Sequence, residues 1–216
     1  MCRGAGLRQP NLELEHKLWA AGYRLLAALD EAGRGAWAGP VVAAAVILPA
    51  GRSDLVNVLR QVRDSKLLTP RRREALFPLI CETALTVGIG MASSRFIDRH
   101  RIIKATQLAM LMALRNLHLE PHCLLIDGLR LPDVEIPQHS LPKGDTRVLS
   151  IAAASIVAKV VRDRLMVALE SSHPDYGFAV HKGYGTSAHR AALKRLGPCH
   201  AHRMSFAPLR QLSDSG

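Results

Sequence analysis

LDEAGRGAWAGPVVAAAVIL, residues 29–48, places an acidic pair and a glycine-framed arginine between two apolar segments. Apolar segments of this length that are joined by a glycine-rich turn predict two buried strands. The acids Asp30 and Glu31 then stand at the mouth of the turn, and residues 33–35 form the turn itself. Because glycine has no side chain, the backbone of this turn can approach a ligand closely. A plain tight turn is the alternative interpretation.

The rest of the chain alternates between strand and helix patterns. Buried strands are predicted over residues 23–29, 40–48, 85–93 and 123–126, with a short edge strand before residue 143. Gly88 and Gly90 within the third strand predict a kink or close packing. Helices are predicted from Asn11 and from Pro70, and over residues 98–119, 151–168 and 186–196. This order predicts an α/β fold around one mixed sheet.

The bulk composition limits the class of protein. A chain of 216 residues fits one domain, and no window reaches the about 20 apolar residues of a membrane helix. Residues 1–10 lack the features of a secretory signal. The four cysteines are far apart and form no CxxC pair, which disfavours a zinc site or a disulfide framework. These features predict a cytoplasmic protein without a membrane partner.

The charge balance favours a polyanionic partner. Lysine and arginine number 29 against 18 acidic residues, which gives a net charge of +11. Neutralised phosphates release counterions, so a basic chain of this size is typical of nucleic-acid binding. The ten histidines are scattered, and we interpret them as solvated or structural side chains rather than zinc ligands.

Acidic residues also end two later extended segments. Asp127 follows an apolar strand, and Asp145 closes an extended segment before a helix. Adjacent strand residues point to opposite faces, so Asp30 and Glu31 can share a site only if the strand ends between them. These four acids together suit two hard cations such as Mg²⁺, which prefer oxygen ligands.

Each acid also has a structural interpretation, as a helix cap or the start of a turn. Asp64 and Asp163 compete for the place of fourth ligand. Asp163 lies in a helical segment between two arginines, which favours an ion pair at the surface.

Several motifs follow one another in a fixed order. They are DEAGRG with AGPVVAAAVIL (residues 30–48), DSKLL (64–68), ATQLAM (105–110), IDG (126–128), KGD (143–145), AAASIVAKVVRD (152–163), HKGYGT (181–186) and HRMSF (202–206). In order and spacing they resemble the ribonuclease HII, or type 2 ribonuclease H, family. The departures are Ala36-Trp37, where the family usually has proline and leucine, and Leu129, where asparagine is common.

The resemblance implies a ribonuclease H-like fold: a central mixed β-sheet flanked by helices, with a C-terminal helical extension over about residues 165–210. The catalytic domain would cover residues 11–210, with a tail of residues 1–10 that we expect to be disordered and a tail of residues 211–216. It also implies a monomer that cleaves RNA in RNA–DNA hybrids and cuts 5′ to single ribonucleotides in duplex DNA. The products would be 3′-hydroxyl and 5′-phosphate ends, the entry step of ribonucleotide excision repair.

The resemblance assigns roles to individual residues. Two Mg²⁺ or Mn²⁺ ions would be bound by Asp30, Glu31, Asp127 and Asp145, with Asp30 bridging both. The RNA–DNA hybrid or ribonucleotide-containing duplex would be contacted by Gly33, Arg34, Gly35, Ser65, Lys66, Lys143, Lys182 and Tyr184. The residues themselves make Arg190, Lys194 and Arg203 further candidates for phosphate contacts, and for a basic residue outside the matched motifs a solvated surface charge is the alternative. The Tyr184 ring would stack on the deoxyribose after the ribonucleotide, although by sequence alone it could equally be a core tyrosine.

Two other functions fit parts of the pattern. A type 3 ribonuclease H would cut hybrids only, but the 22 residues before the first predicted strand are expected to leave no room for the extra N-terminal domain of that class. A non-catalytic hybrid-binding module is the second alternative, and the intact set of acids argues against it.

Overall fold

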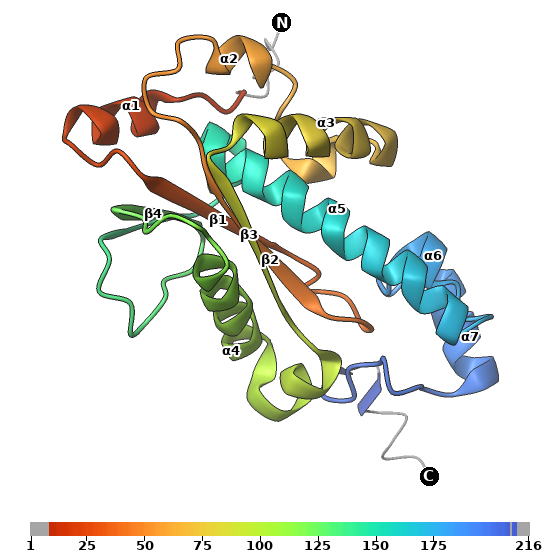
Figure 1. Cartoon of the computed structure of the whole chain (residues 1–216). Helices are drawn as coiled ribbons and strands as arrows, with labels where there is room; N and C mark the ends of the chain where they lie inside the picture. The colour runs from red at the N-terminus through yellow and green to blue at the C-terminus, as the bar shows by residue number, and fades with distance from the viewer. Residues whose placement is uncertain (1–8, 208, 211–216) are drawn as a thin grey trace, which may run out of the picture. The chain divides into compact units, whose positions relative to one another are not determined.

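The computed structural model describes residues 9–207 and 209–210 and contains one five-stranded mixed sheet in the order β3-β2-β1-β4-β5. Figure 1 follows these elements along the chain. The N-terminal tail that we expect to be disordered covers residues 1–10, of which only residues 9 and 10 are described. The predicted C-terminal tail, residues 211–216, lies outside the described residues. The α/β fold with a mixed sheet and flanking helices is confirmed.

The strands are β1 (Leu26–Ala32), β2 (Val41–Ile47), β3 (Thr86–Ala92), β4 (Cys123–Asp127) and β5 (Gln138–Leu141). The α-helices are α1 (Glu13–Ala20), α2 (Leu55–Val58), α3 (Pro70–Thr83), α4 (Ser94–Arg115), α5 (Leu149–Ser172), α6 (Phe178–His181) and α7 (Ser187–Leu196). Two 3-10 helices, η1 (Ser65–Leu67) and η2 (Gly144–Thr146), precede α3 and α5. Helix α5 is the longest, as predicted.

The chain forms two compact units, each drawn from three segments. The first comprises the described residues within Met1–Asp30, Ala45–Val87 and Leu117–Val157. The second comprises those within Glu31–Ala44, Gly88–Asn116 and Ala158–Gly216.

In the first unit, β4 lies between β1 and β5 and runs parallel to both. Residues 26–29 of β1 and 123–126 of β4 are buried, as their apolar sequences predict for a central parallel pair. Helix α3 begins as predicted, because Pro70 occupies its first turn and the Thr69 hydroxyl accepts a hydrogen bond from the Arg72 amide. The unit therefore holds Asp30 of β1 and the carboxyl end of β4 beside a buried pair of strands.

In the second unit, the predicted close packing of Gly88 and Gly90 is confirmed. A Cβ atom on these glycines would lie 2.0 and 2.1 Å from the backbone oxygens of Ala113 and Ala109 in α4. Only a residue without a side chain allows the strand and the helix backbone to approach this closely.

Strand β1 extends further than predicted. The sequence places its end at Leu29, but the strand continues through Ala32 and includes both acids of the pair. The break falls at Gly33, which has a φ of +94°. None of the helices among the described residues is long and apolar enough to cross a lipid bilayer.

Candidate active site

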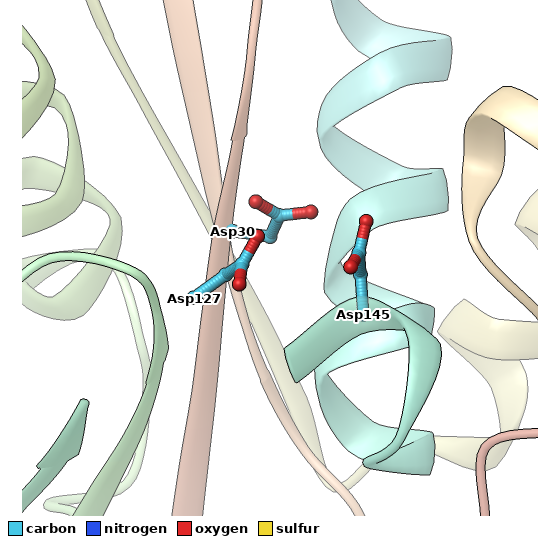
Figure 2. Close-up of side chains that lie close together, drawn as sticks. All are labelled: Asp30, Asp127 and Asp145. Carbon is cyan, nitrogen blue, oxygen red and sulfur yellow. The ribbon is translucent and has the colours of Figure 1, made fainter. Parts of the chain in front are cut away.

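Three carboxylates gather in the first unit. Asp30, Asp127 and Asp145 each offer one oxygen, and these oxygens lie within 4.8 Å of one another. Figure 2 shows Asp30 on β1, Asp127 at the end of β4, and Asp145 on the turn that precedes α5. Asp30 and Asp145 are buried, with 4% and 3% of their surface exposed.

The sheet register explains why two of these acids meet. Leu29 of β1 pairs with Ile126 of the parallel strand β4. The next residue on each strand is Asp30 and Asp127 respectively. Residues at the same level of neighbouring strands point to the same face of a sheet, so the two carboxylates project together.

Asp127 also holds the turn that carries the third acid. Its Oδ1 atom accepts a hydrogen bond of 2.8 Å from the Gly144 amide. A Cβ atom on Gly144 would lie 2.6 Å from Cδ1 of Ile151, so a larger residue would displace the turn. The register of the sheet and this bond therefore fix Asp145 beside the strand ends.

Negative charge accumulates at the cluster. Burial, with the nearby charges of Asp64 and Asp127, raises the pKa of Asp145 to about 6. The Lys66 ammonium lies 3.7 Å from Oδ2 of Asp145 and lowers the pKa of that carboxyl, but the Lys66 side chain is 78% exposed. A buried group of like charges with oxygen donors favours a hard divalent cation. The residues present therefore fit Mg²⁺ or Mn²⁺.

The other predicted acids have different contacts. Glu31 accepts a hydrogen bond of 3.2 Å from Arg34 and is not in the group of three. Because β1 continues through both acids, the expected strand end between Asp30 and Glu31 is wrong, and the metal contact of Glu31 stays a prediction. Asp64 accepts a bond from the Lys66 amide and caps η1. Asp163 pairs with Lys159 at 2.7 Å within α5, which is an ion pair as expected, although both side chains are at least four-fifths buried.

In the second unit, the turn after β1 rests on a buried arginine. The Arg162 guanidinium is fully buried and donates hydrogen bonds to the backbone oxygens of Ala38, Pro40 and Lys182. A Cβ atom on Gly33 would lie 1.9 Å from its Nε atom. Gly33 is thus required both by its φ of +94° and by this guanidinium.

The segment with the predicted junction reader is held by the same arginine. Lys182 and Gly183 have consecutive positive φ values of 52° and 77°, a backbone that ordinary residues rarely adopt. The Lys182 ammonium bonds the Ala179 carbonyl. The half-buried Tyr184 ring has the charged groups of Lys159 and Arg162 each 5.2 Å from its centroid.

Two predicted phosphate contacts are buried. Arg203 is fully buried and donates to the backbone oxygens of Arg34 and Gly39, so the prediction that it contacts a phosphate is wrong. Ser65 is 4% exposed and its hydroxyl bonds that of Ser155 at 2.8 Å. Its substrate contact, like those of Lys66, Lys143 and Lys182, stays a prediction.

Sequence reasoning missed the role of Arg162. A signal was present, because Ala154, Ala158 and Arg162 follow one another at intervals of four residues and so share one face of α5. A charged residue on an apolar helix face must find buried partners.

The comparison with known proteins decides the family. The family model described as Ribonuclease HII matches residues 27–209. The chain belongs to the ribonuclease HII family.

Two named relatives show how much of the family sequence is shared. A Ribonuclease HII of Roseiflexus castenholzii is 54% identical over 200 residues, 93% of this chain and 89% of the relative. A Ribonuclease HII of Chloroflexus aggregans is 50% identical over 205 residues, 95% of this chain and 97% of the relative. Among solved structures, ribonuclease H2 from Pyrococcus horikoshii OT3 is similar with a TM-score of 0.72 and 25% identity, covering 88% of this chain and 98% of that one.

Membership in the ribonuclease HII family makes this chain a metal-dependent endoribonuclease that acts on RNA–DNA hybrids. The carboxylate cluster of Asp30, Asp127 and Asp145 is its candidate metal centre.

Proposed function

We propose that this ribonuclease HII cuts on the 5′ side of single ribonucleotides in duplex DNA, as well as within RNA–DNA hybrids, and leaves 3′-hydroxyl and 5′-phosphate ends. The observation that carries the proposal is the convergence of Asp30, Asp127 and Asp145 within 4.8 Å. We also propose that two Mg²⁺ or Mn²⁺ ions serve this site. The protein would work as a cytoplasmic monomer whose cut begins ribonucleotide excision repair.

The acids would hold the ions in the following way. Asp30 is the candidate for bridging both, because it lies on the central strand β1 beside Asp127. Asp145 is tied to Asp127 through the Gly144 amide, and Glu31 would add the fourth carboxylate, with Asp64 as its alternative. When bound, two divalent cations supply activation of water for attack at phosphorus and stabilisation of the leaving 3′-oxygen.

Lys66 would assist the arrival of the substrate. Its ammonium lies beside Asp145 while most of its side chain is exposed. A long exposed lysine can move between a carboxylate and an incoming phosphate at small energetic cost. Lys66 would therefore contact a backbone phosphate and position the duplex without reading its bases.

Selection of the ribonucleotide would fall to the Gly33-Arg34-Gly35 turn and Tyr184. Recognition of RNA requires a group that senses the 2′-hydroxyl, and Arg34 and Gly35 are exposed on this turn. Support comes from Arg162, whose guanidinium fills the space that a Cβ atom on Gly33 would need and donates a hydrogen bond to the Lys182 carbonyl, two residues before Tyr184. A shared support of this kind would keep the distance between the two sensing elements constant.

Cleavage of a DNA duplex with one embedded ribonucleotide tests the proposal. The purified protein is incubated with Mg²⁺ or Mn²⁺ and that duplex, and in parallel with a long RNA–DNA hybrid. Cuts on the 5′ side of the ribonucleotide and within the hybrid are expected. Cuts in the hybrid alone would assign the hybrid-only activity of a type 3 enzyme, and binding without cleavage would assign a binding module.

A further inference from the structure

Buried histidines surround the backbone of the segment that carries Tyr184. His181, His189 and His202 are 8%, 0% and 2% exposed, and all lie in the second unit. The His181 and His189 rings stack with centroids 4.3 Å apart, and the centroids of the His189 and His202 rings are 5.3 Å apart. Neither the metal site nor the proposed substrate contacts use these side chains.

Two of the histidines form a continuous hydrogen-bonded chain. At one end, the Cys199 amide donates to Nδ1 of His202 over 3.0 Å. The Nε2 atoms of His202 and His189 are 3.0 Å apart. At the other end, Nδ1 of His189 lies 3.0 Å from the Tyr184 carbonyl oxygen.

The groups at the two ends of this hydrogen-bonded chain determine which ring nitrogens of His202 and His189 carry the protons. A backbone amide can only donate, so Nδ1 of His202 accepts and its proton is on Nε2. The Cys199 carbonyl oxygen and thiol sulfur are each also 3.2 Å from Nδ1, but the amide hydrogen already occupies that lone pair. Nε2 of His202 therefore donates to Nε2 of His189. This leaves Nδ1 of His189 to carry a proton, which it donates to the Tyr184 carbonyl, an obligatory acceptor.

The third histidine has its proton fixed by the same reasoning. The Gly183 amide donates to Nδ1 of His181 over 3.1 Å. The proton of His181 is therefore on Nε2, which donates over 2.7 Å to the Tyr176 carbonyl. The backbone on both sides of the Tyr184 peptide is thus held by neutral imidazoles of one defined tautomer each.

The structure assigns His202 and His189 as positioning residues for Tyr184, acting as a neutral, directionally ordered pair that sets the preference for single-ribonucleotide junctions. This assignment rests on the junction-reading role proposed for Tyr184. The Tyr184 carbonyl accepts a second bond from the Thr186 amide at 2.8 Å, so the segment retains its local turn when the histidine bond is lost. Removal of the pair should therefore shift the ring rather than unfold the segment.

The surroundings keep both imidazoles neutral. Burial lowers the pKa of each to about 4. The titratable groups around the pair are His181, His173, Tyr176 and Cys199, contributed by α6 and the loops that follow α5 and α7. None of these is a carboxylate, and burial raises the pKa of the Cys199 thiol, which disfavours a thiolate that could stabilise an imidazolium. Protonation of either ring would place two donors face to face and break the chain.

Nitrogen NMR of the intact, metal-loaded protein tests the tautomers directly. Long-range ¹H–¹⁵N correlation spectra distinguish protonated from unprotonated ring nitrogens at neutral pH. We expect His189 to be protonated on Nδ1, and His202 and His181 on Nε2. The opposite tautomer at His189 or His202, or a doubly protonated ring, would overturn the assignment whatever the activity of Tyr184 proves to be.

Paired variants test the effect on substrate choice. His189→Asn keeps an amide donor near the position of Nδ1, whereas His189→Leu removes it. Loss of one buried hydrogen bond corresponds to about a tenfold effect, so His189→Leu should lower the ratio of single-ribonucleotide to hybrid cleavage about tenfold. His189→Asn should stay near the wild-type ratio. His173→Leu is the matched control, because that ring bonds Leu169 and His200, and it should leave the ratio unchanged.

Two results separate this inference from the proposed function. A folded His189→Leu protein with the wild-type ratio, beside a Tyr184→Ala protein that selectively loses junction cleavage, would refute the histidine assignment alone. A Tyr184→Ala protein that loses both activities equally would instead refute the junction-reading role. Equal ratios in His189→Leu and His173→Leu would likewise count against the assignment, since both remove a buried histidine.

Discussion

Replacing Asp145 by asparagine should stabilise the metal-free protein while abolishing its activity. The pKa of this buried carboxyl is raised from 3.8 to about 6, which is about two units, or about 3 kcal/mol at 1.36 kcal/mol per unit. An acid with a raised folded-state pKa destabilises the fold as pH rises from 3.8 through 6, and the full penalty is present above pH 6. Asparagine has nearly the same shape and carries no charge.

The expected gain in the free energy of unfolding is about 1–3 kcal/mol at pH 7.5 in the presence of a chelator. For a chain of this size each 1 kcal/mol raises the melting temperature by about 2–4 °C. At pH 4 or below, both proteins carry a mostly neutral side chain at this position and the difference should shrink. Saturating Mg²⁺ should narrow the stability difference between the two proteins at pH 7.5, because only the wild type offers the metal its full set of carboxylate ligands.

Urea unfolding of both proteins at pH 4 and pH 7.5, with and without Mg²⁺, measures these four differences. Asp54→Asn is the matched control, because Asp54 is exposed and pairs with Arg52 at the surface, where removing an acid should change stability by less than about 1 kcal/mol. An Asp145→Asn protein that is no more stable than the wild type at pH 7.5 without metal would refute the reasoning. An equal difference at both pH values would refute it too.

Three further predictions concern the second unit. Gly33→Ala should reduce cleavage of every substrate, because its Cβ would lie 1.9 Å from Nε of Arg162 and the positive φ disfavours alanine. Circular dichroism checks that the variant is folded, and full activity would contradict the requirement for glycine at this position. Tyr184→Ala should lose single-ribonucleotide cleavage more than hybrid cleavage in steady-state assays, and an equal loss would contradict a junction-reading role. His189 and His202 have folded-state pKa values near 4, so their contribution of about 3 kcal/mol each should be present above pH 6.5 and lost as pH falls toward 4. Urea unfolding at several pH values across that range measures whether the free energy of unfolding falls as the pH falls. The fall should be smaller in His189→Asn, which lacks one of the two histidines.

The backbone layout could be read from the sequence because it depends on local patterns. The apolar residues of β2 and β4 are nearly all buried, and the spacing of small residues in α5 predicts a long helix. For the same reason Asp127 could be placed at a strand end and Asp145 just before a helix. The end of β1 was misplaced at Leu29 because Asp30 and Glu31 read as polar, whereas the strand continues through them to the glycine that breaks it.

Contacts between distant parts of the sequence could not be read in this way. Arg203 resembles any basic residue of a charged tail, yet it is buried and donates hydrogen bonds to the backbone oxygens of Arg34 and Gly39. The pairing of His189 with His202 depends on the tertiary path after α7. A histidine carries no sequence signal for its tautomer, because the tautomer is determined by the partners that the fold supplies.

The central claim is that the carboxylates of Asp30, Asp127 and Asp145 hold the metal that drives cleavage. Single-turnover cleavage of an RNA–DNA hybrid by Asp30→Asn in saturating Mg²⁺, with hybrid affinity measured in parallel, tests it most directly. The account predicts a loss of at least about a hundredfold in rate with affinity for the hybrid nearly unchanged, while Asp54→Asn stays at the wild-type rate. A near-normal cleavage rate in Asp30→Asn would contradict it.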